Sequence, residues 1–193
     1  DLIYFQKQKK GIIEFLKKIG FKHNINNSLQ TSGANLTSNW DDYFNSIKKR
    51  IRYDSRRQER RLKDKGQLKF LLSINSEEKL DVIKSMMVQK SRRYRQTKIW
   101  DMLSIKEYKN YYSGLSKIKS NSFEIHCSSL VLDSQNIASH VGIVDQKNFY
   151  YLMPSHEGGE WEKYSPGRLL LIELIKWSIK NNKSFFDFTV GAE

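Results

Sequence analysis

The chain has 193 residues, of which 38% are hydrophobic and 12% aromatic, so it is long and apolar enough to form one compact domain. It contains no apolar run of the roughly 20 residues that cross a bilayer, and its single cysteine, Cys127, excludes an intramolecular disulfide and a cysteine-built zinc site. The net charge of +13 is local, because residues 48–65 and 90–98 hold fifteen Lys and Arg residues against three acidic ones. Such stripes attract phosphate groups, although a solvated helix face has the same composition.

The first 39 residues are expected to precede the main domain. A short strand at residues 2–5 and an amphipathic helix that ends at Gly20 account for much of residues 1–30. Residues 31–39 are rich in Asn, Ser, Thr and Gly and are predicted to be a connector. Because the chain starts without Met and ends soon after a strand-like run, we expect it to be a segment of a longer protein.

A long basic helix is predicted from Trp40 to Gly66, since apolar residues recur there at three- and four-residue steps and Ser38 is a suitable N-cap. Its apolar stripe is expected to face the protein and comprises Trp40, Tyr43, Phe44, Ile47 and Ile51. Three arginines on another face are expected to project to solvent near the ligand-binding cleft, namely Arg50, Arg57 and Arg61. A strand at residues 69–74, a helix from residue 76 to about 94 and a helical stretch over about 105–118 follow.

The apolar period changes to two after residue 122. This change predicts strands at residues 123–127, 137–144 and 149–153, joined by polar four-residue turns. Residues 168–180 form a helix that is apolar on too many sides to lie free on the surface, so it should pack on a sheet. A last strand is expected at residues 184–190. The predicted fold class is therefore α/β (α+β), a mixed sheet with helices on its faces.

The start of this last helix is the best candidate for a ligand site. Pro166 suits the first helical turn, and Gly167 lets a ligand approach the backbone. The exposed N–H groups and the positive helix end would attract an anion, and Arg168 adds a charge beside them. A Ser-Pro-Gly sequence also starts helices that bind no ligand, so both readings stay open here.

Five sequence pieces occur in order: Arg60-Arg61-Leu62 with Gly66, Asn136-Ile137-Ala138, Phe149-Tyr150-Tyr151, Tyr164-Ser165-Pro166-Gly167, and Phe186-Asp187-Phe188 with Gly191-Ala192-Glu193. Through these pieces residues 40–193 resemble the GNAT acyltransferase superfamily. More narrowly, they resemble its CelD-like branch, described as cellulose-biosynthesis acetyltransferase domains and related to the Fem-type peptidyl transferases. The resemblance implies a mostly antiparallel sheet with helices on both faces, incomplete at the C-terminus, and a preceding GNAT-like lobe that ends within residues 1–30.

The resemblance also implies a coenzyme A site in the loop before the last helix, at Ser165, Pro166, Gly167, Arg168 and Leu169. Two departures from the family pattern stand out. The GNAT loop usually carries an Arg or Gln followed by two glycines, whereas this loop has the single Gly167. The chain also stops at Glu193, where the family continues with further strands.

Acyl transfer to an amine needs a base, or a water relay, and an acid for the departing thiolate. The candidate catalytic residues are His140, Tyr164, Asp187 and Glu193. The first three also have structural readings, as a packed histidine, a packed tyrosine and a hydrogen-bonded carboxylate. Three residues of the loop before Tyr164 are candidates for an acceptor site: His156, Glu157 and Glu160. Cys127 is expected to fill the core, and no metal-ligand spacing is found.

The sequence thus favours an N-acyltransferase that uses acetyl-CoA or another acyl-CoA to acylate an amine of a sugar or cell-envelope precursor, in the cytoplasm. One alternative is a tRNA-dependent aminoacyl transferase, since related Fem-type enzymes take aminoacyl groups from tRNA, or an RNA-binding module. Its tRNA or other polyanion would lie on the basic stripes. Another alternative is a catalytically inactive GNAT scaffold.

Overall fold

The structure is a computed structural model that describes residue 18 and residues 32–189. Its strands are β1 (Ser32–Asn35), β2 (Leu68–Leu72), β3 (Glu124–Leu132), β4 (Gln135–Val144), β5 (Asn148–His156) and β6 (Phe185–Thr189). Its α-helices are α2 (Trp40–Ser46), α3 (Lys49–Lys63), α4 (Ser76–Thr97), α5 (Lys106–Gly114) and α6 (Pro166–Lys180). Short 3-10 helices are η1 (Met102–Ser104), η2 (Leu115–Lys117) and η3 (Gly159–Tyr164). The strand and helix predicted within residues 1–30 lie outside the described residues, apart from Lys18.

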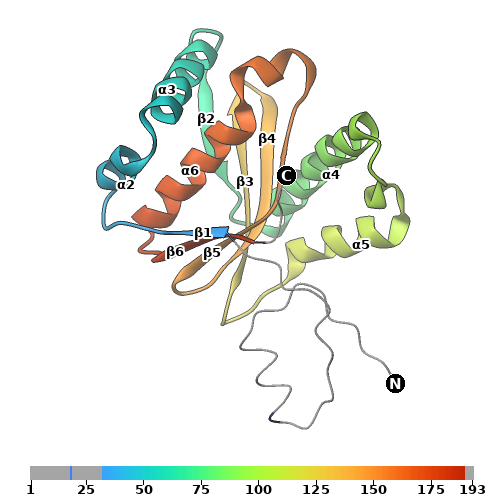
Figure 1. Ribbon diagram of the computed structural model, residues 1–193. Helices are drawn as coiled ribbons and strands as arrows, with labels where there is room; N and C mark the ends of the chain where they lie inside the picture. Colours follow the sequence, from blue (N-terminus) through green and yellow to red (C-terminus); the bar gives the residue numbers. More distant parts are fainter. Residues whose placement is uncertain (1–17, 19–31, 190–193) are drawn as a thin grey trace.

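These strands form one sheet in the order β1-β6-β5-β4-β3-β2. Neighbouring strands are antiparallel except β5 and β6, which run parallel with α6 as the crossover between them. Figure 1 shows α2, α3 and α6 on one side of the sheet and α4 and α5 on the other. The prediction of a mixed, mostly antiparallel sheet with helices on both faces is confirmed. Strand β1 lies in the segment predicted as a connector, so residues 32–35 belong to the sheet.

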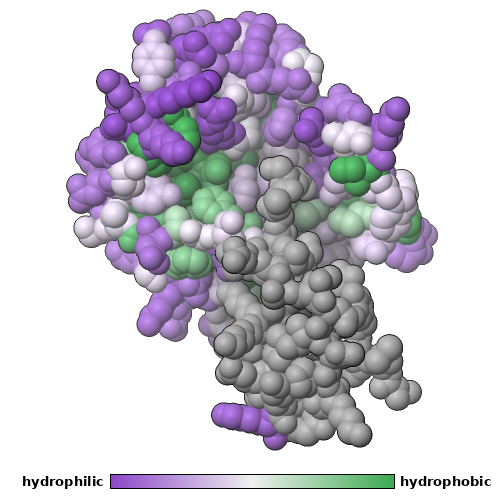
Figure 2. All heavy atoms as spheres, viewed as in Figure 1, coloured by the Kyte–Doolittle hydropathy of each residue, from purple (hydrophilic) through white to green (hydrophobic). Residues whose placement is uncertain are grey.

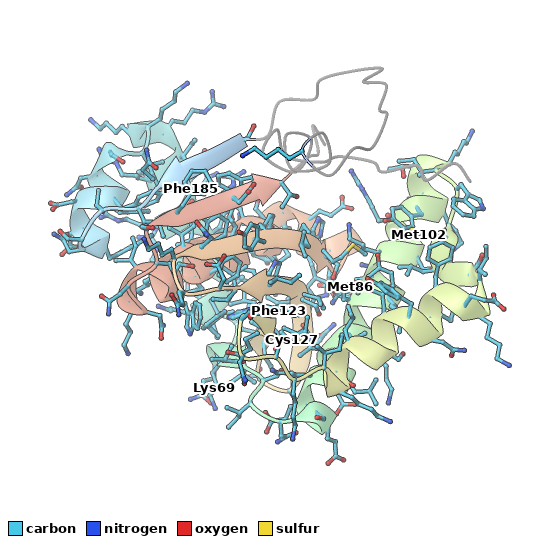
Figure 3. The ribbon with its side chains drawn as sticks, turned by 90° about the horizontal axis from the view of Figure 1, so that it is seen from below. Lys69, Met86, Met102, Phe123, Cys127 and Phe185 are labelled. Atoms are coloured by element: carbon cyan, nitrogen blue, oxygen red, sulfur yellow. The ribbon has the colours of Figure 1, made fainter. Side chains whose placement is uncertain are left out.

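The two faces of the sheet bury different cores. On one face, the apolar stripe of α6 packs on the sheet, with Leu174 fully buried and the Trp177 ring set edge-on to Phe149. On the other face, α4 buries Met86 in one cluster with Cys127 of β3, as Figure 3 illustrates. Cys127 is a free, buried thiol, as expected for a core residue. No helix among the described residues is long and apolar enough to cross a bilayer.

The prediction of one long basic helix is wrong, because the segment forms the two helices α2 and α3. Between them Ile47 is extended, with φ −71° and ψ 144°. Helix α3 buries a different face from the predicted stripe, and Ile51 is 42% exposed instead of facing the protein. The residues that α3 buries are Ser55, Gln58 and Leu62. Neither Gly nor Pro marks the break, which is why the apolar period alone missed it.

Candidate functional site

The parallel pairing between β5 and β6 is short. It joins three residue pairs, the last of which is Tyr150 with Asp187, although β5 continues to His156. No strand in the described part of the chain pairs with that edge of residues 152–156. Next to the last pair, the hydroxyl of Thr189 donates a hydrogen bond of 3.2 Å to the Tyr151 carbonyl oxygen. Among the described residues the pairing of β5 with β6 thus ends next to Tyr151, and we call this place, together with the edge of residues 152–156 beyond it, the β5–β6 split.

A β-bulge accompanies the split. Against β4, Val141 pairs with Met153 and Ile143 with Tyr150, so β5 carries one extra residue between these pairs. Gly142 lies opposite the bulge, and a Cβ atom there would be 2.4 Å from the Tyr150 carbonyl oxygen. Only glycine permits this approach. A bulge bends its strand and increases the twist, so this one changes the course of β5 just after its last pair with β6.

The N-terminus of α6 follows the loop after β5. Ser165 is left-handed, with φ 51° and ψ 53°, Pro166 opens the helix, and no side chain among the described residues caps it. The amides of Arg168 and Leu169 donate to the Ser165 carbonyl oxygen at 3.0 and 3.2 Å. Since Pro166 has no N–H, Gly167 carries the first-turn amide that can face a ligand. The helix dipole and the exposed Arg168 make this end of the helix positive.

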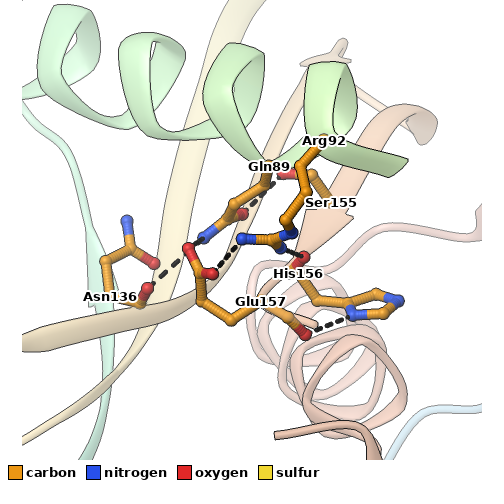
Figure 4. Close-up of polar contacts among 6 residues, drawn as sticks. All are labelled: Gln89, Arg92, Asn136, Ser155, His156 and Glu157. Carbon is orange, nitrogen blue, oxygen red and sulfur yellow. Dashed lines mark hydrogen bonds and ion pairs between the residues drawn. The ribbon is translucent and has the colours of Figure 1, made fainter. Parts of the chain in front are cut away.

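A polar cluster joins α4 to the loop that leads to α6 (Figure 4). Glu157 forms an ion pair with Arg92 of α4 and accepts a hydrogen bond of 3.3 Å from the Gln89 amide. Arg92 also donates to the His156 carbonyl oxygen at 2.6 Å, and the Ser155 hydroxyl donates to the Gln89 side-chain oxygen at 2.8 Å. The sequence alone did not predict this cluster, because Gln89 and Arg92 have the pattern of a solvent-exposed polar face of a helix. Their three-residue spacing on that helix was the available signal.

His156 connects the polar cluster to the start of α6. A Cβ atom at Gly167 would lie 3.0 Å from Cδ2 of His156, so the imidazole ring packs directly on the helix start. His156 Nδ1 lies 2.8 Å from the Glu157 carbonyl oxygen. A carbonyl only accepts hydrogen bonds, so in the neutral ring Nδ1 holds the proton and Nε2 is an acceptor. The glycine therefore serves this packing contact as well as exposing its amide.

The same cluster changes the interpretation of the basic stripe at residues 90–98. Arg92 is half-buried in its ion pair, and Lys90 is buried with its ammonium group 5.7 Å from the Tyr94 ring centroid. Arg93, Arg95 and Lys98 remain exposed. Two of the five cations thus contribute to packing and are not open to a nucleic-acid backbone.

Of the predicted catalytic residues, Asp187 lies at the start of the split. Its side chain is 3% exposed and accepts a hydrogen bond of 2.8 Å from the Thr189 N–H. Thr189 has a φ of 60°, a strained value for a β-branched residue. A strained backbone and a buried carboxylate thus coincide where the described pairing of β5 with β6 ends.

His140 lies in the core on the side of the sheet that α6 covers. Its buried ring stacks on Tyr151, with the centroids 4.9 Å apart and the planes 8° from parallel. Burial lowers the pKa of His140 well below its usual value, and the neighbouring His126 and Lys90 lower it further. The structure does not bring His140 and Asp187 together. Phe186 lies in the core under α6 with His140, and Asp187 alternates to the other face of the sheet.

Tyr164 lies at a different place, between η3 and α6. Its buried ring has the Arg61 guanidinium 4.9 Å from its centroid and the Lys163 ammonium 5.2 Å away. Arg61 thus lies against Tyr164 instead of projecting to solvent as predicted, and within α3 it also donates to the Gln58 side-chain oxygen at 2.9 Å. Glu193 lies outside the described residues. Among the residues that are described, no group of three or more His, Cys, Asp or Glu side chains could hold a metal ion.

Comparisons with known proteins identify the fold. It is similar to the crystal structure of FemX, with a TM-score of 0.66 and 11% identity, over 94% of this chain and 60% of that one. A conserved protein of unknown function from Bacteroides thetaiotaomicron is also similar, with a TM-score of 0.55 and 7% identity over 94% of this chain and 58% of its own. The third is the C-terminal domain of a protein assigned as a lysylphosphatidylglycerol synthetase from Agrobacterium fabrum. It has a TM-score of 0.53 and 9% identity, over 84% of this chain and 46% of its own.

The chain thus spans between 46% and 60% of the length of these structures, and at such identities they share its fold alone. No curated protein matches the sequence. The family described as acetyltransferase (GNAT) domain matches residues 49–193, which is most of the chain. This protein therefore belongs to the acetyltransferase (GNAT) domain family.

Proposed function

We propose that this chain takes an acyl group from acyl-CoA, acetyl-CoA included, and transfers it to an amine of a sugar or cell-envelope precursor. Membership of the GNAT family supports an acyltransferase reaction. The observation that carries the choice of acyl-CoA is the β5–β6 split, together with the uncapped N-terminus of α6 beyond its far end.

The two ends of the split offer different chemistry. At α6, the Gly167 amide, the Arg168 charge and the helix dipole suit a pyrophosphate, while Ser165, Pro166 and Leu169 form the turn around them. Near Tyr151, a buried carboxylate and a hydroxyl suit the reacting end. Residues 151–156 are extended and span roughly 16 Å. The pantetheine arm of acyl-CoA is long enough to bridge that separation.

Acyl transfer replaces the carbon–sulfur bond of a thioester with a carbon–nitrogen bond; a proton must leave the amine, and coenzyme A departs as a thiolate that takes up a proton from solvent. We assign that proton to Asp187, directly or through one water, because Asp187 is the carboxylate at the start of the split. His140 stacks on Tyr151 and would act by holding that residue in place. Tyr164 and Glu193 stay predictions, with no described contact at the split.

Titration calorimetry with coenzyme A tests the anion site. Arg168→Glu is expected to weaken coenzyme A binding about tenfold, because it reverses an exposed charge at the helix start. Lys180→Glu, which reverses an exposed charge at the other end of the same helix, is the matched control and should leave binding unchanged. No saturable binding below about 1 mM would sink the acyl-CoA proposal.

Replacing Asp187 with Asn separates an enzyme from an inactive scaffold. We expect kcat to fall by about 100-fold or more while coenzyme A affinity is retained, since the change removes a base and leaves the α6 site intact. Full activity in Asp187→Asn would show that another group acts as the base. A chain that keeps its fold and binds no acyl-CoA would instead be a catalytically inactive scaffold.

Aminoacyl transfer from tRNA is a second candidate, supported by the similarity to FemX and by the surface of α3. Eight cations lie exposed at or near this helix: Lys48, Lys49, Arg50, Arg56, Arg57, Arg60, Lys63 and Lys65. If five or six of them contact phosphates, the logarithm of the tRNA binding constant should fall with the logarithm of salt concentration at a slope of about −4 to −5. A flat salt dependence would remove this candidate.

The finer assignments rest on the sequence. Membership of the CelD-like branch is a proposal supported by the five ordered pieces, and a cytoplasmic location is a proposal supported by the single cysteine. The division at residues 31–39 into a preceding lobe and an acyltransferase domain also stays a prediction.

A further inference from the structure

Helix α5 carries three tyrosines, Tyr108, Tyr111 and Tyr112, yet none of its nine described residues is buried. Tyr112 alone is packed against the α4 core, and its hydroxyl lies 3.6 Å from the Met153 sulfur. A helix of a globular protein normally buries one apolar face. The other aromatic side chains of α5 therefore belong to a face that the described residues leave uncovered.

This face continues into the segment between α4 and η1. We define the aromatic patch as Ile99, Trp100, Tyr108 and Tyr111, all of which are exposed. Trp100 is 66% exposed and Tyr111 64%. The rings of Trp100 and Tyr108 lie 6.1 Å apart, edge to face, so the patch is continuous from the end of α4 onto α5. At the right of Figure 2, where Figure 1 places α5, hydrophobic and near-neutral residues lie beside strongly hydrophilic ones.

The stretch of sequence that carries the patch is rich in cations. Between residues 93 and 119 there are seven Lys and Arg residues against two acidic ones, and all seven cations are exposed. Of the two acidic residues, Asp101 is engaged internally, since its carboxylate accepts hydrogen bonds from the Ser91 hydroxyl and the Leu103 N–H. The aromatic patch thus lies in a positive field.

We infer that the aromatic patch docks on a lipid bilayer that carries anionic headgroups. Trp and Tyr side chains favour the boundary between headgroups and hydrocarbon, and nearby Lys and Arg are attracted to anionic lipids. Exposed Ile99 gains from contact with acyl chains. A single-stranded nucleic acid fits less well, because the 84° angle between the Trp100 and Tyr108 rings gives stacked bases no common platform. The inference does not depend on the acyl donor.

Cosedimentation of the chain with vesicles tests the inference. We expect binding to vesicles of phosphatidylcholine with phosphatidylglycerol, and binding about tenfold weaker to phosphatidylcholine alone. The double variant Trp100→Ser/Tyr111→Ser should lose about tenfold in binding. Tyr53→Ser is the matched control, because Tyr53 is a 67% exposed tyrosine on α3, which is also basic, and the variant should bind like the parent chain.

A second pair of variants tests whether vesicle binding depends on charges next to the patch or on the positive charge of the chain as a whole. Lys106→Glu/Lys109→Glu, next to the patch, should abolish most binding, whereas Lys48→Glu/Lys49→Glu should not. Trp100→Phe keeps the patch apolar and should keep binding, but it should lose most of the tryptophan quenching that brominated acyl chains cause in the parent. That loss distinguishes insertion among lipids from binding of free phosphate.

Several outcomes would overturn the inference. They are no binding to anionic vesicles, equal losses in the α3 control variants, or quenching unchanged in Trp100→Phe. The inference would also be overturned if the chain binds no vesicles but binds an RNA oligonucleotide, and the patch variants weaken that RNA binding. A concentration-dependent dimer that the patch variants dissolve, with no vesicle binding, would assign the patch to a contact between copies of this chain.

Discussion

At the scale of single residues, two histidines in the core under α6 are the most unusual feature. His126 and His140 are buried with their ring centroids 6.0 Å apart, and none of their four ring nitrogens has a hydrogen-bond partner in the described part of the chain. Burial, and then Lys79, lowers the pKa of His126 to about 3, and the pKa of His140 is also well below its usual value. The folded protein therefore keeps both rings neutral.

These histidines should make the protein sensitive to acid. The unfolded chain binds protons at both residues below about pH 6.5, whereas the folded chain does not, so stability is lost as the pH falls. Each histidine contributes up to about 1.4 kcal/mol per pH unit, or about 2.7 kcal/mol for the pair. Urea unfolding between about pH 7 and pH 5 measures this slope. His126→Phe should reduce it by about half, and an unchanged slope would contradict the assignment.

Substitution of Gly142 tests whether the bulge in β5 requires a glycine opposite it. Gly142→Ala would put a Cβ atom 2.4 Å from a backbone carbonyl oxygen, and we expect the free energy of unfolding to fall by about 1–3 kcal/mol. Gly114→Ala is the matched control, since Gly114 is helical and nothing lies near its Cβ position. That change should stabilise the protein by about 0.5–1 kcal/mol. Equal effects of the two substitutions in chemical denaturation would argue against the bulge.

At the scale of elements, α3 carries arginines of two kinds. Arg57 is exposed and pairs with Asp54 in the same helix at 3.3 Å, whereas Arg61 lies against the buried ring of Tyr164, just before α6. Arg57→Glu should change the free energy of unfolding by about 0.5 kcal/mol or less. Arg61→Glu should cost about 1–3 kcal/mol, because it removes the cation over Tyr164 and a charged hydrogen bond. Similar urea midpoints for the two variants would contradict this division.

At the scale of the whole molecule, β4 lies at the centre of the sheet, between β3 and β5, with helices on both faces. Its amides should exchange with solvent only on global unfolding, whereas those of the edge strands β1 and β2 should exchange by local opening. Adding coenzyme A should slow exchange at residues 152–157 and 165–169 and leave α5 unchanged. Mass spectrometry of exchange with and without coenzyme A measures both effects. Protection confined to α3 would instead place the coenzyme A phosphates on that basic helix.

Local patterns in the sequence predicted most of the architecture. The change of apolar period after residue 122 located β3, β4 and β5, and the broad apolar stripe placed α6 on the sheet. Pro166 and Gly167 marked the helix start, because their backbone preferences depend on residue type alone. Strands β3 and β5 extend past their predicted ends, since buried polar residues such as Ser128 and Ser155 interrupt the apolar pattern.

Contacts between distant segments decided the site. The extra residue in β5 exists only relative to β4, so nothing within β5 predicted where the split begins. Arg92 reads as a surface cation, yet its partner Glu157 is 65 residues away in the sequence. Whether His140 faced a ligand or a core depended on which face of the sheet α6 covers. The apolar period of a segment shows which of its own residues face the core and which face solvent. These contacts, in contrast, depend on how segments far apart in the chain pack together.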